Sequence, residues 1–130
     1  MATYANREEL TAVLDKVVAG LNENDTVKNR MKTANVSMGI VVSDLEGAEY
    51  VMAFRNGEVT GSPAGASAAT VTITMKQEVL DRLFSGKVSG ESAYFSGLLR
   101  LRGDEWVAES LASYVYYMLP IYQAATADLA

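Results

Sequence analysis

The side chains that could carry out chemistry in this sequence are carboxylates, hydroxyls and amines, because the chain contains neither histidine nor cysteine. Histidine is the commonest metal ligand and general base, and cysteine supplies thiolates and disulfides. A tyrosine paired with a carboxylate could still transfer a proton. Glu105 and Glu109 lie at helical spacing near Trp106, but carboxylates are also favoured in the first turn of a helix. We predict no catalytic residue, no metal and no cofactor.

Tyrosines and methionines form a second group of candidate residues. The tyrosines near the C-terminus, Tyr114, Tyr116, Tyr117 and Tyr122, could hydrogen-bond the head group of a ligand while their rings line an apolar slot, or could serve as core and rim residues. The methionines could adapt the interior to ligands of variable shape, or could simply fill gaps in the core. Both interpretations remain open from the sequence.

The charge balance narrows the class of partner. The chain carries 16 acidic and 11 basic residues, which gives a net charge of -5. Nucleic acids and anionic membranes select clustered Lys and Arg, whereas the basic residues here are scattered, so we expect no nucleic-acid partner. The uncharged stretch 110–127 contains four tyrosines and a proline, so we expect a buried helix and no stable membrane insertion. Residues 1–5 do not resemble a signal peptide, which predicts a cytoplasmic location.

The elements that position these residues follow from the hydrophobic periodicity. The length and the apolar content predict a single domain over residues 1–130. Helical spacing predicts helices over residues 6–22, over 76–84 and from 107 onward, with a turn or short helix over 91–95. A further short helix is predicted to be capped by Asp25 or Thr26 and to end at about residue 31. Alternation predicts strands over 35–43, 49–55 and 70–75, a short strand after Asn56-Gly57, and a fifth within 97–103. Pro120 should kink or end the last helix.

The strands have one apolar face and one face of Thr, Ser and Arg residues. Such a sheet requires a helical layer on the apolar side only. The sequence therefore predicts a two-layer α+β domain in which the last helix covers apolar sheet residues.

Several segments of the second half together resemble a known family. They are Thr72-Ile73-Thr74-Met75, Ser85-Gly86-Lys87 and the run from Ser92 through Phe95 and Gly97 to Gly103-Asp104. This order resembles the sterol carrier protein-2 family, also called non-specific lipid-transfer proteins, and the likeness covers nearly the whole chain. The resemblance implies a five-stranded, mostly antiparallel sheet with helices packed on one face and a hydrophobic tunnel between the layers. Members of the family bind sterols, fatty acids, acyl-CoAs or phospholipids without cofactors.

The function that this resemblance implies is the binding and carriage of an apolar ligand. The alternatives are a dimerising interaction module with a closed core, which would form a homodimer through the C-terminal helix, and a small isomerase-like enzyme that uses Tyr and a carboxylate. We expect a carrier and no enzyme. The residues predicted to contact the ligand are Met38, Ile40, Ile73, Met75, Leu83, Phe84, Phe95, Leu99, Leu101, Trp106, Leu111, Tyr114, Val115 and Met118.

Overall fold

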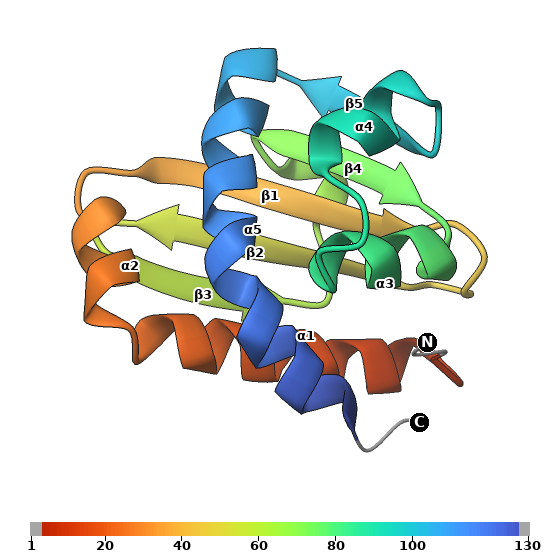
Figure 1. The fold of residues 1–130 in the computed structure, drawn as a ribbon, viewed down its shortest axis with the longest axis horizontal. Coiled ribbons are helices and arrows are strands. Elements are labelled where there is room, and N and C mark those ends of the chain that lie inside the picture. The colour runs from red at the N-terminus through yellow and green to blue at the C-terminus, as the bar shows by residue number, and fades with distance from the viewer. Residues whose placement is uncertain (1–3, 128–130) are drawn as a thin grey trace.

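A computed structural model describes residues 4–127 of the chain, and Figure 1 shows their arrangement. The helices are α1 (Arg7–Asn22), α2 (Asp25–Arg30), the short 3-10 helix η1 (Ala66–Ala68), α3 (Gln77–Phe84), α4 (Gly90–Phe95) and α5 (Glu105–Thr126). The strands are β1 (Asn35–Val42), β2 (Glu49–Arg55), β3 (Glu58–Ser62), β4 (Val71–Met75) and β5 (Leu99–Gly103). These bounds confirm the predicted elements to within a few residues. The expectation about residues 1–5 falls in part outside the described residues.

The five strands form one sheet in the order β3-β2-β1-β4-β5. Every neighbouring pair is antiparallel except β1 and β4, which are parallel, with Ile40 opposite Ile73. A parallel pair needs a crossover connection, and here residues 63–70 cross from β3 to the far side of β1. The α+β class and the mostly antiparallel, five-stranded sheet are therefore confirmed.

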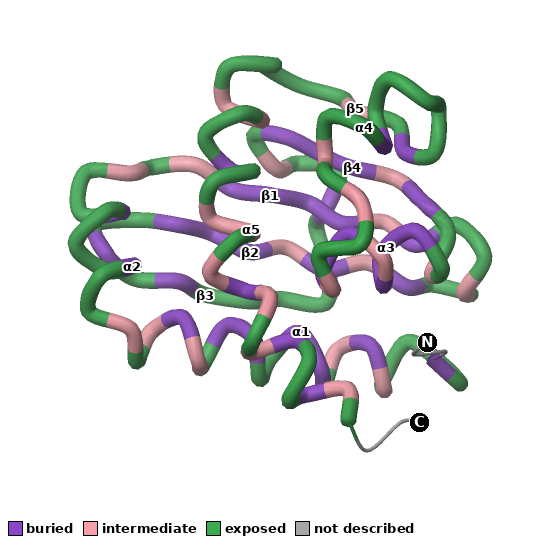
Figure 2. The backbone as a smooth tube through the Cα atoms, in the orientation of Figure 1, coloured by how far each residue is buried: buried purple, intermediate pink, exposed green. Residues whose placement is uncertain are grey.

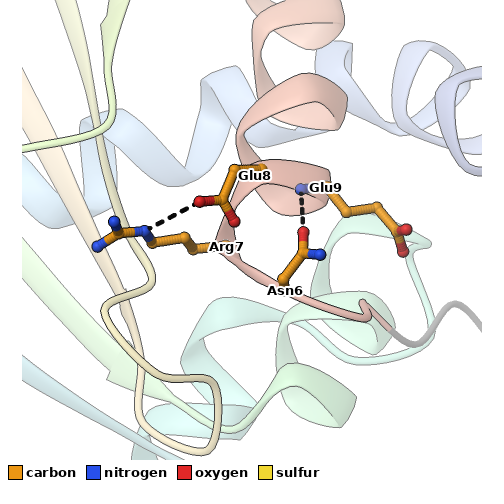
Figure 3. A network of polar contacts seen from close by, with 4 residues as sticks. All are labelled: Asn6, Arg7, Glu8 and Glu9. Carbon is orange, nitrogen blue, oxygen red and sulfur yellow. Dashed lines mark hydrogen bonds and ion pairs between the residues drawn. The ribbon is translucent and has the colours of Figure 1, made fainter.

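The start of α1 shows how local sequence fixes an element. The side chain of Asn6 accepts a hydrogen bond from the backbone N–H of Glu9 at 3.0 Å (Figure 3), which satisfies a donor that the first helical turn leaves free. In the same view Arg7 forms an ion pair with Glu8 on the surface. The apolar stripe of α1 is buried, as its spacing predicts: Leu10, Val13, Leu14, Val17, Val18 and Leu21.

The face of the sheet opposite the α-helices is partly covered by η1. A Cβ added to Gly39 would collide with the backbone carbonyl of Ala66, so only glycine fits beneath this segment. Thr72 Oγ1 donates a hydrogen bond to the same carbonyl oxygen at 2.7 Å. The polar face of β1 and β4 therefore contacts this loop as well as solvent.

The cap of α2 differs from the sequence prediction, and of the two outcomes predicted for Pro120 the structure excludes an end of the helix. The N-cap of α2 is Asn24, whose side chain accepts from the N–H of Val27, so the cap lies one residue before Asp25. Pro120 does not end α5, which continues to Thr126. Tyr122 and Ala125 are buried on this last segment, and their packing offsets the hydrogen bond that Pro120 cannot donate. Within residues 4–127, no helix is long and apolar enough to cross a membrane.

Candidate functional site

An apolar cleft of about 930 Å³ lies between the sheet and α5. Its floor comes from β1, β4 and β5 through Met38, Val71, Ile73, Leu99 and Leu101. One side of α5 forms the opposite wall, and residues of α3, α4 and the loop between them close one end. In Figure 1, α5 crosses the sheet from the β5 edge to α1. Clefts of this size accept small apolar ligands.

The strand alternation places apolar residues of β4 and β5 on the floor. Ile73 is paired with Leu101 across the two strands, so both side chains share one face of the sheet. Arg100 and Arg102 then belong to the opposite face. Arg102 confirms this, because its guanidinium donates to the backbone oxygen of Ser67 at 2.6 Å, in the loop that crosses that face.

The residues of α5 fall into two stripes with different surroundings. Leu111, Met118, Tyr122 and Ala125 are buried, and of these Leu111 also lines the cleft. A second stripe, offset around the helix, faces the cleft: Ala108, Ala112, Val115 and Leu119. In Figure 2 the N-terminal part of α5 is mainly exposed or half-buried. This part of the helix therefore forms one wall of the cleft, and its side chains do not fill it.

Most of the residues predicted to contact a ligand line this cleft. They are Met38, Ile73, Leu83, Phe95, Leu99, Leu101, Trp106, Leu111 and Val115. Contact with a ligand itself stays a prediction for each of them.

The other predicted contact residues lie away from the cleft. Ile40, Met75, Phe84 and Met118 are buried in the core. The ring of Tyr114 packs against Phe54 with 5.1 Å between centroids. These residues share the apolar face of the sheet or of a helix, but neighbouring elements cover them completely or, for Tyr114, in part. Alternation and helical spacing report the face, and they do not report how far along it a cleft extends.

The lining residues outside the predicted set include small residues of α5 and polar residues at α4, together with Val71, Gly86, Val88, Gly90, Glu105, Glu109, Tyr116 and Leu119. The small residues Ala108 and Ala112 carry no strong apolar signal, although their spacing from Val115 and Leu119 is helical. The polar residues Ser89, Glu91 and Tyr94 lie on α4 or just before it. Their position at the cleft depends on how α4 packs, which spacing alone does not give.

The mouth of the cleft carries exposed aromatic rings. Trp106 is 81% exposed, Phe95 78% and Tyr116 70%, and all three line the cleft. Tyr94 lies beside Phe95 and donates a hydrogen bond to Glu105 at 3.3 Å, which links α4 to the start of α5. The described residues form an open cleft along this rim, and the enclosed tunnel expected from the resemblance stays a prediction.

Two buried tyrosines form tyrosine–carboxylate pairs outside the cleft, whereas the Tyr94–Glu105 pair lies at its mouth. Tyr122 donates to Asp81 at 3.0 Å, and Tyr50 donates to Asp15 at 2.6 Å. Burial raises the pKa of both tyrosines, and their hydrogen-bonded neighbours raise it further. None of these side chains lines the cleft. Buried, protonated tyrosines in such pairs stabilise the fold and have no access to a substrate there.

A family model described as the SCP-2 sterol transfer family matches residues 14–115. The chain belongs to this family. Among solved structures, the SCP-2 fold recurs in a conserved hypothetical protein from Thermus thermophilus, with a TM-score of 0.68 and 17% identity, covering 97% of this chain and 92% of that one. It recurs in the sterol carrier protein domain 2 of Helicoverpa armigera, with a TM-score of 0.66 and 18% identity, covering 92% and 95%.

An SCP-2-like region also occurs inside a much larger enzyme. The inverting sec-alkylsulfatase Pisa1 from Pseudomonas sp. has a TM-score of 0.59 and 21% identity, and the match covers 66% of this chain. The chain spans only 14% of the length of that enzyme. At these identities the structural likenesses show the shared fold alone. No curated protein matches the sequence.

Proposed function

We propose that this SCP-2 family chain binds one apolar ligand in the cleft between the sheet and α5 and carries it, without catalysing a reaction. The observation that supports this most directly is the cleft of about 930 Å³ with an apolar floor and an apolar helical wall. Membership of a sterol transfer family points the same way. The ligands to consider are a fatty acid, an acyl-CoA, a phospholipid or a sterol-like molecule.

The energetics of such a cleft favour long alkyl chains. Burying a methylene is worth roughly 0.8 kcal/mol, so a chain of about sixteen methylenes gains some 13 kcal/mol in total. Association and ordering of the ligand cost at least about 4 kcal/mol and usually more. An affinity in the micromolar range or somewhat tighter is expected. The tail supplies most of this energy, and the groups at the mouth decide which head group is preferred.

An isomerase-like activity has less support. A carboxylate base and a tyrosine donor would have to flank the bound substrate. The pairs Tyr50–Asp15 and Tyr122–Asp81 lie outside the cleft, and the Tyr94–Glu105 pair lies at its exposed mouth. An exposed mouth does not exclude water from a proton transfer, so we do not assign a catalytic role to this pair.

A homodimer formed through α5 is the second candidate. Trp106 and Tyr116 expose large rings on this helix, and large exposed apolar surfaces often mark interfaces. In that arrangement a second copy would cover the cleft. Size-exclusion chromatography with light scattering tests this candidate, because a homodimer formed through α5 would have twice the mass of the chain.

A substitution that fills the cleft tests the carrier function. Ala112 faces the cleft, whereas Ala124 is exposed further along the same helix and does not line it. We expect Ala112→Phe to weaken the binding of the neutral fluorescent probe Nile red at least tenfold. Ala124→Phe, which adds the same group, is the matched control and should bind normally. Native mass spectrometry of the purified chain should also reveal retained lipid mass.

Two results would contradict the proposed binding site or the carrier function. If neither Nile red nor dodecanol binds to the folded chain, the carrier function is wrong. If Ala112→Phe and Ala124→Phe bind the probe as tightly as the unchanged chain, the ligand lies outside this cleft.

A further inference from the structure

The charges around the cleft are of one sign. Within the part of the chain that the structure describes, the charged residues that line the cleft are Glu91, Glu105 and Glu109, with no Lys or Arg among the lining residues. All three are exposed at the mouth. The hydrogen bond from Tyr94 to Glu105 places Glu105 next to α4, the helix that carries Glu91.

Among the described residues, no positively charged side chain near the cleft lines it. Arg102 binds the loop on the opposite face of the sheet, and Arg100 alternates onto that same face. Lys87 is exposed between two lining residues but does not itself line the cleft. The N-terminus of α5 would attract an anion, but the Asp104 carboxylate accepts from the N–H groups of Trp106 and Val107 and occupies that position.

The aromatic rings at the mouth also favour a positively charged group. Trp106, Phe95 and Tyr116 present exposed rings beside the three glutamates. The face of an aromatic ring attracts cations, and quaternary ammonium groups in particular bind among several rings. Carboxylates gain nothing comparable from such rings.

The mouth also continues into a second, shallower depression of about 540 Å³. It is lined by Ser89, Glu91, Ser92, Phe95 and Ser96 and shares Ser89, Glu91 and Phe95 with the cleft. Among residues 4–127, Glu91 is the one charged residue that lines it. A tail in the cleft would therefore leave its head group against serine hydroxyls, aromatic rings and a carboxylate.

We infer that the cleft takes long-chain amphiphiles with a positively charged ammonium head group in preference to those with a carboxylate or phosphate. The inference rests on the proposed carrier function and names the class of ligand. Glu91, Glu105 and Glu109 act as the specificity-determining residues. The alkyl tail lies on the apolar floor, and the head group lies at the mouth.

The size of the preference follows from the exposure of the glutamates. A solvent-exposed charge pair changes an equilibrium by no more than a few-fold. Three such charges together are expected to favour the ammonium over a neutral head group by roughly tenfold at low ionic strength. The carboxylate should bind more weakly than the neutral compound. Salt screens these charges within about 10 Å at 0.1 M, so added salt should reduce the preference.

The experiment compares three head groups on one tail. Dodecyltrimethylammonium, dodecanol and dodecanoate, each kept below its critical micelle concentration, compete with Nile red for the purified full chain at low and high salt. Circular dichroism in the same solutions establishes that the chain stays folded. The expected order of affinity is ammonium, then alcohol, then carboxylate, with the differences narrowing at high salt.

Charge variants then assign the preference to the mouth. The triple variant Glu91→Gln, Glu105→Gln, Glu109→Gln should lose the preference for the ammonium and still bind dodecanol. The triple variant Glu23→Gln, Glu46→Gln, Glu58→Gln removes the same net charge from exposed positions that do not line the cleft, and it should keep the preference.

Four kinds of outcome would overturn the inference or the carrier function. Equal affinity for the three compounds, or tighter binding of dodecanoate, overturns the inference but leaves the carrier function in place. Loss of the preference in both triple variants shows that the net charge of the chain, and not the mouth, selects the ligand, which also overturns it. If Nile red binds and none of the three compounds displaces it, the inference is overturned. If neither Nile red nor dodecanol binds to the folded chain, the carrier function itself is wrong.

Discussion

The hydroxyl oxygens of Tyr4 and Tyr122 lie 2.5 Å apart, although 118 positions separate the two residues in the sequence. Tyr122 donates its single hydroxyl proton to Asp81, so Tyr4 must be the donor to Tyr122. All three residues are buried. The network therefore ties the segment before α1 to α3 and to the last turns of α5.

Removing the central hydroxyl should destabilise the chain more than removing the terminal one. Tyr122→Phe breaks both hydrogen bonds and leaves the buried Asp81 carboxylate without a partner, whereas Tyr4→Phe leaves the bond from Tyr122 to Asp81 intact. We expect a loss of about 1–3 kcal/mol of unfolding free energy for Tyr122→Phe and about 1 kcal/mol for Tyr4→Phe, measured by urea denaturation. The control is Tyr116→Phe, an exposed position that should change little. A larger loss for Tyr4→Phe would contradict this network.

Stability should fall in alkaline solution because of the buried tyrosines. Burial raises the pKa of Tyr4 to about 12 and raises the pKa of Tyr50 and Tyr122 as well. Above about pH 10 the unfolded chain releases these protons and the folded chain retains them. Below about pH 10 both states keep these protons, so the tyrosines should not make the free energy of unfolding depend on pH. Above about pH 10 this free energy should decrease with rising pH by roughly 1.4 kcal/mol per pH unit for each tyrosine that the folded state keeps protonated.

Urea titrations between about pH 8 and pH 12 measure this slope on either side of the ordinary tyrosine pKa. Tyr122→Phe should flatten this slope by removing one of the groups whose pKa is raised. Stability that rises above about pH 10 would mean that these hydroxyls are not protonated and buried in the folded chain.

Neighbouring positions on α5 should separate stability from binding. Met118 is fully buried in the core, whereas Val115 faces the cleft. We expect Met118→Ala to cost about 2–5 kcal/mol through the cavity it leaves, with an unchanged affinity of the folded fraction for Nile red. Val115→Ser should cost less stability and weaken the binding of Nile red several-fold. An affinity loss in Met118→Ala alone would place the ligand on the other stripe of the helix.

Trp106 should report occupation of the mouth. It is the single tryptophan of the chain and is 81% exposed beside the cleft. Adding dodecanol to saturation should shift its emission to shorter wavelength, since a ligand at the mouth removes water from the ring. A Trp106→Phe variant should still bind Nile red and should lack the signal. If binding saturates with no change in the spectrum, the ligand does not reach this residue.

The sequence alone determined the elements and the fold class. Alternation in β1 and β4 and the helical stripe of α1 depend on residues close together in the chain, and local periodicity reports them directly. The same reasoning left open whether α5 continues beyond Pro120. Pro120 signals a break, and only the burial of Tyr122 and Ala125 against distant elements allows the helix to continue.

The sequence also determined that a histidine or cysteine site is excluded, and that apolar residues of β4, β5 and α5 would face one another. The tertiary structure decided which of these residues line the cleft and which are buried in the core. Met118 and Val115 have similar apolar character, yet one is core and the other faces the cleft, because the rotation of a helix about its axis is set by the elements packed against it. The gathering of Glu91, Glu105 and Glu109 at one mouth arose in the same way, from the packing of α4 beside α5.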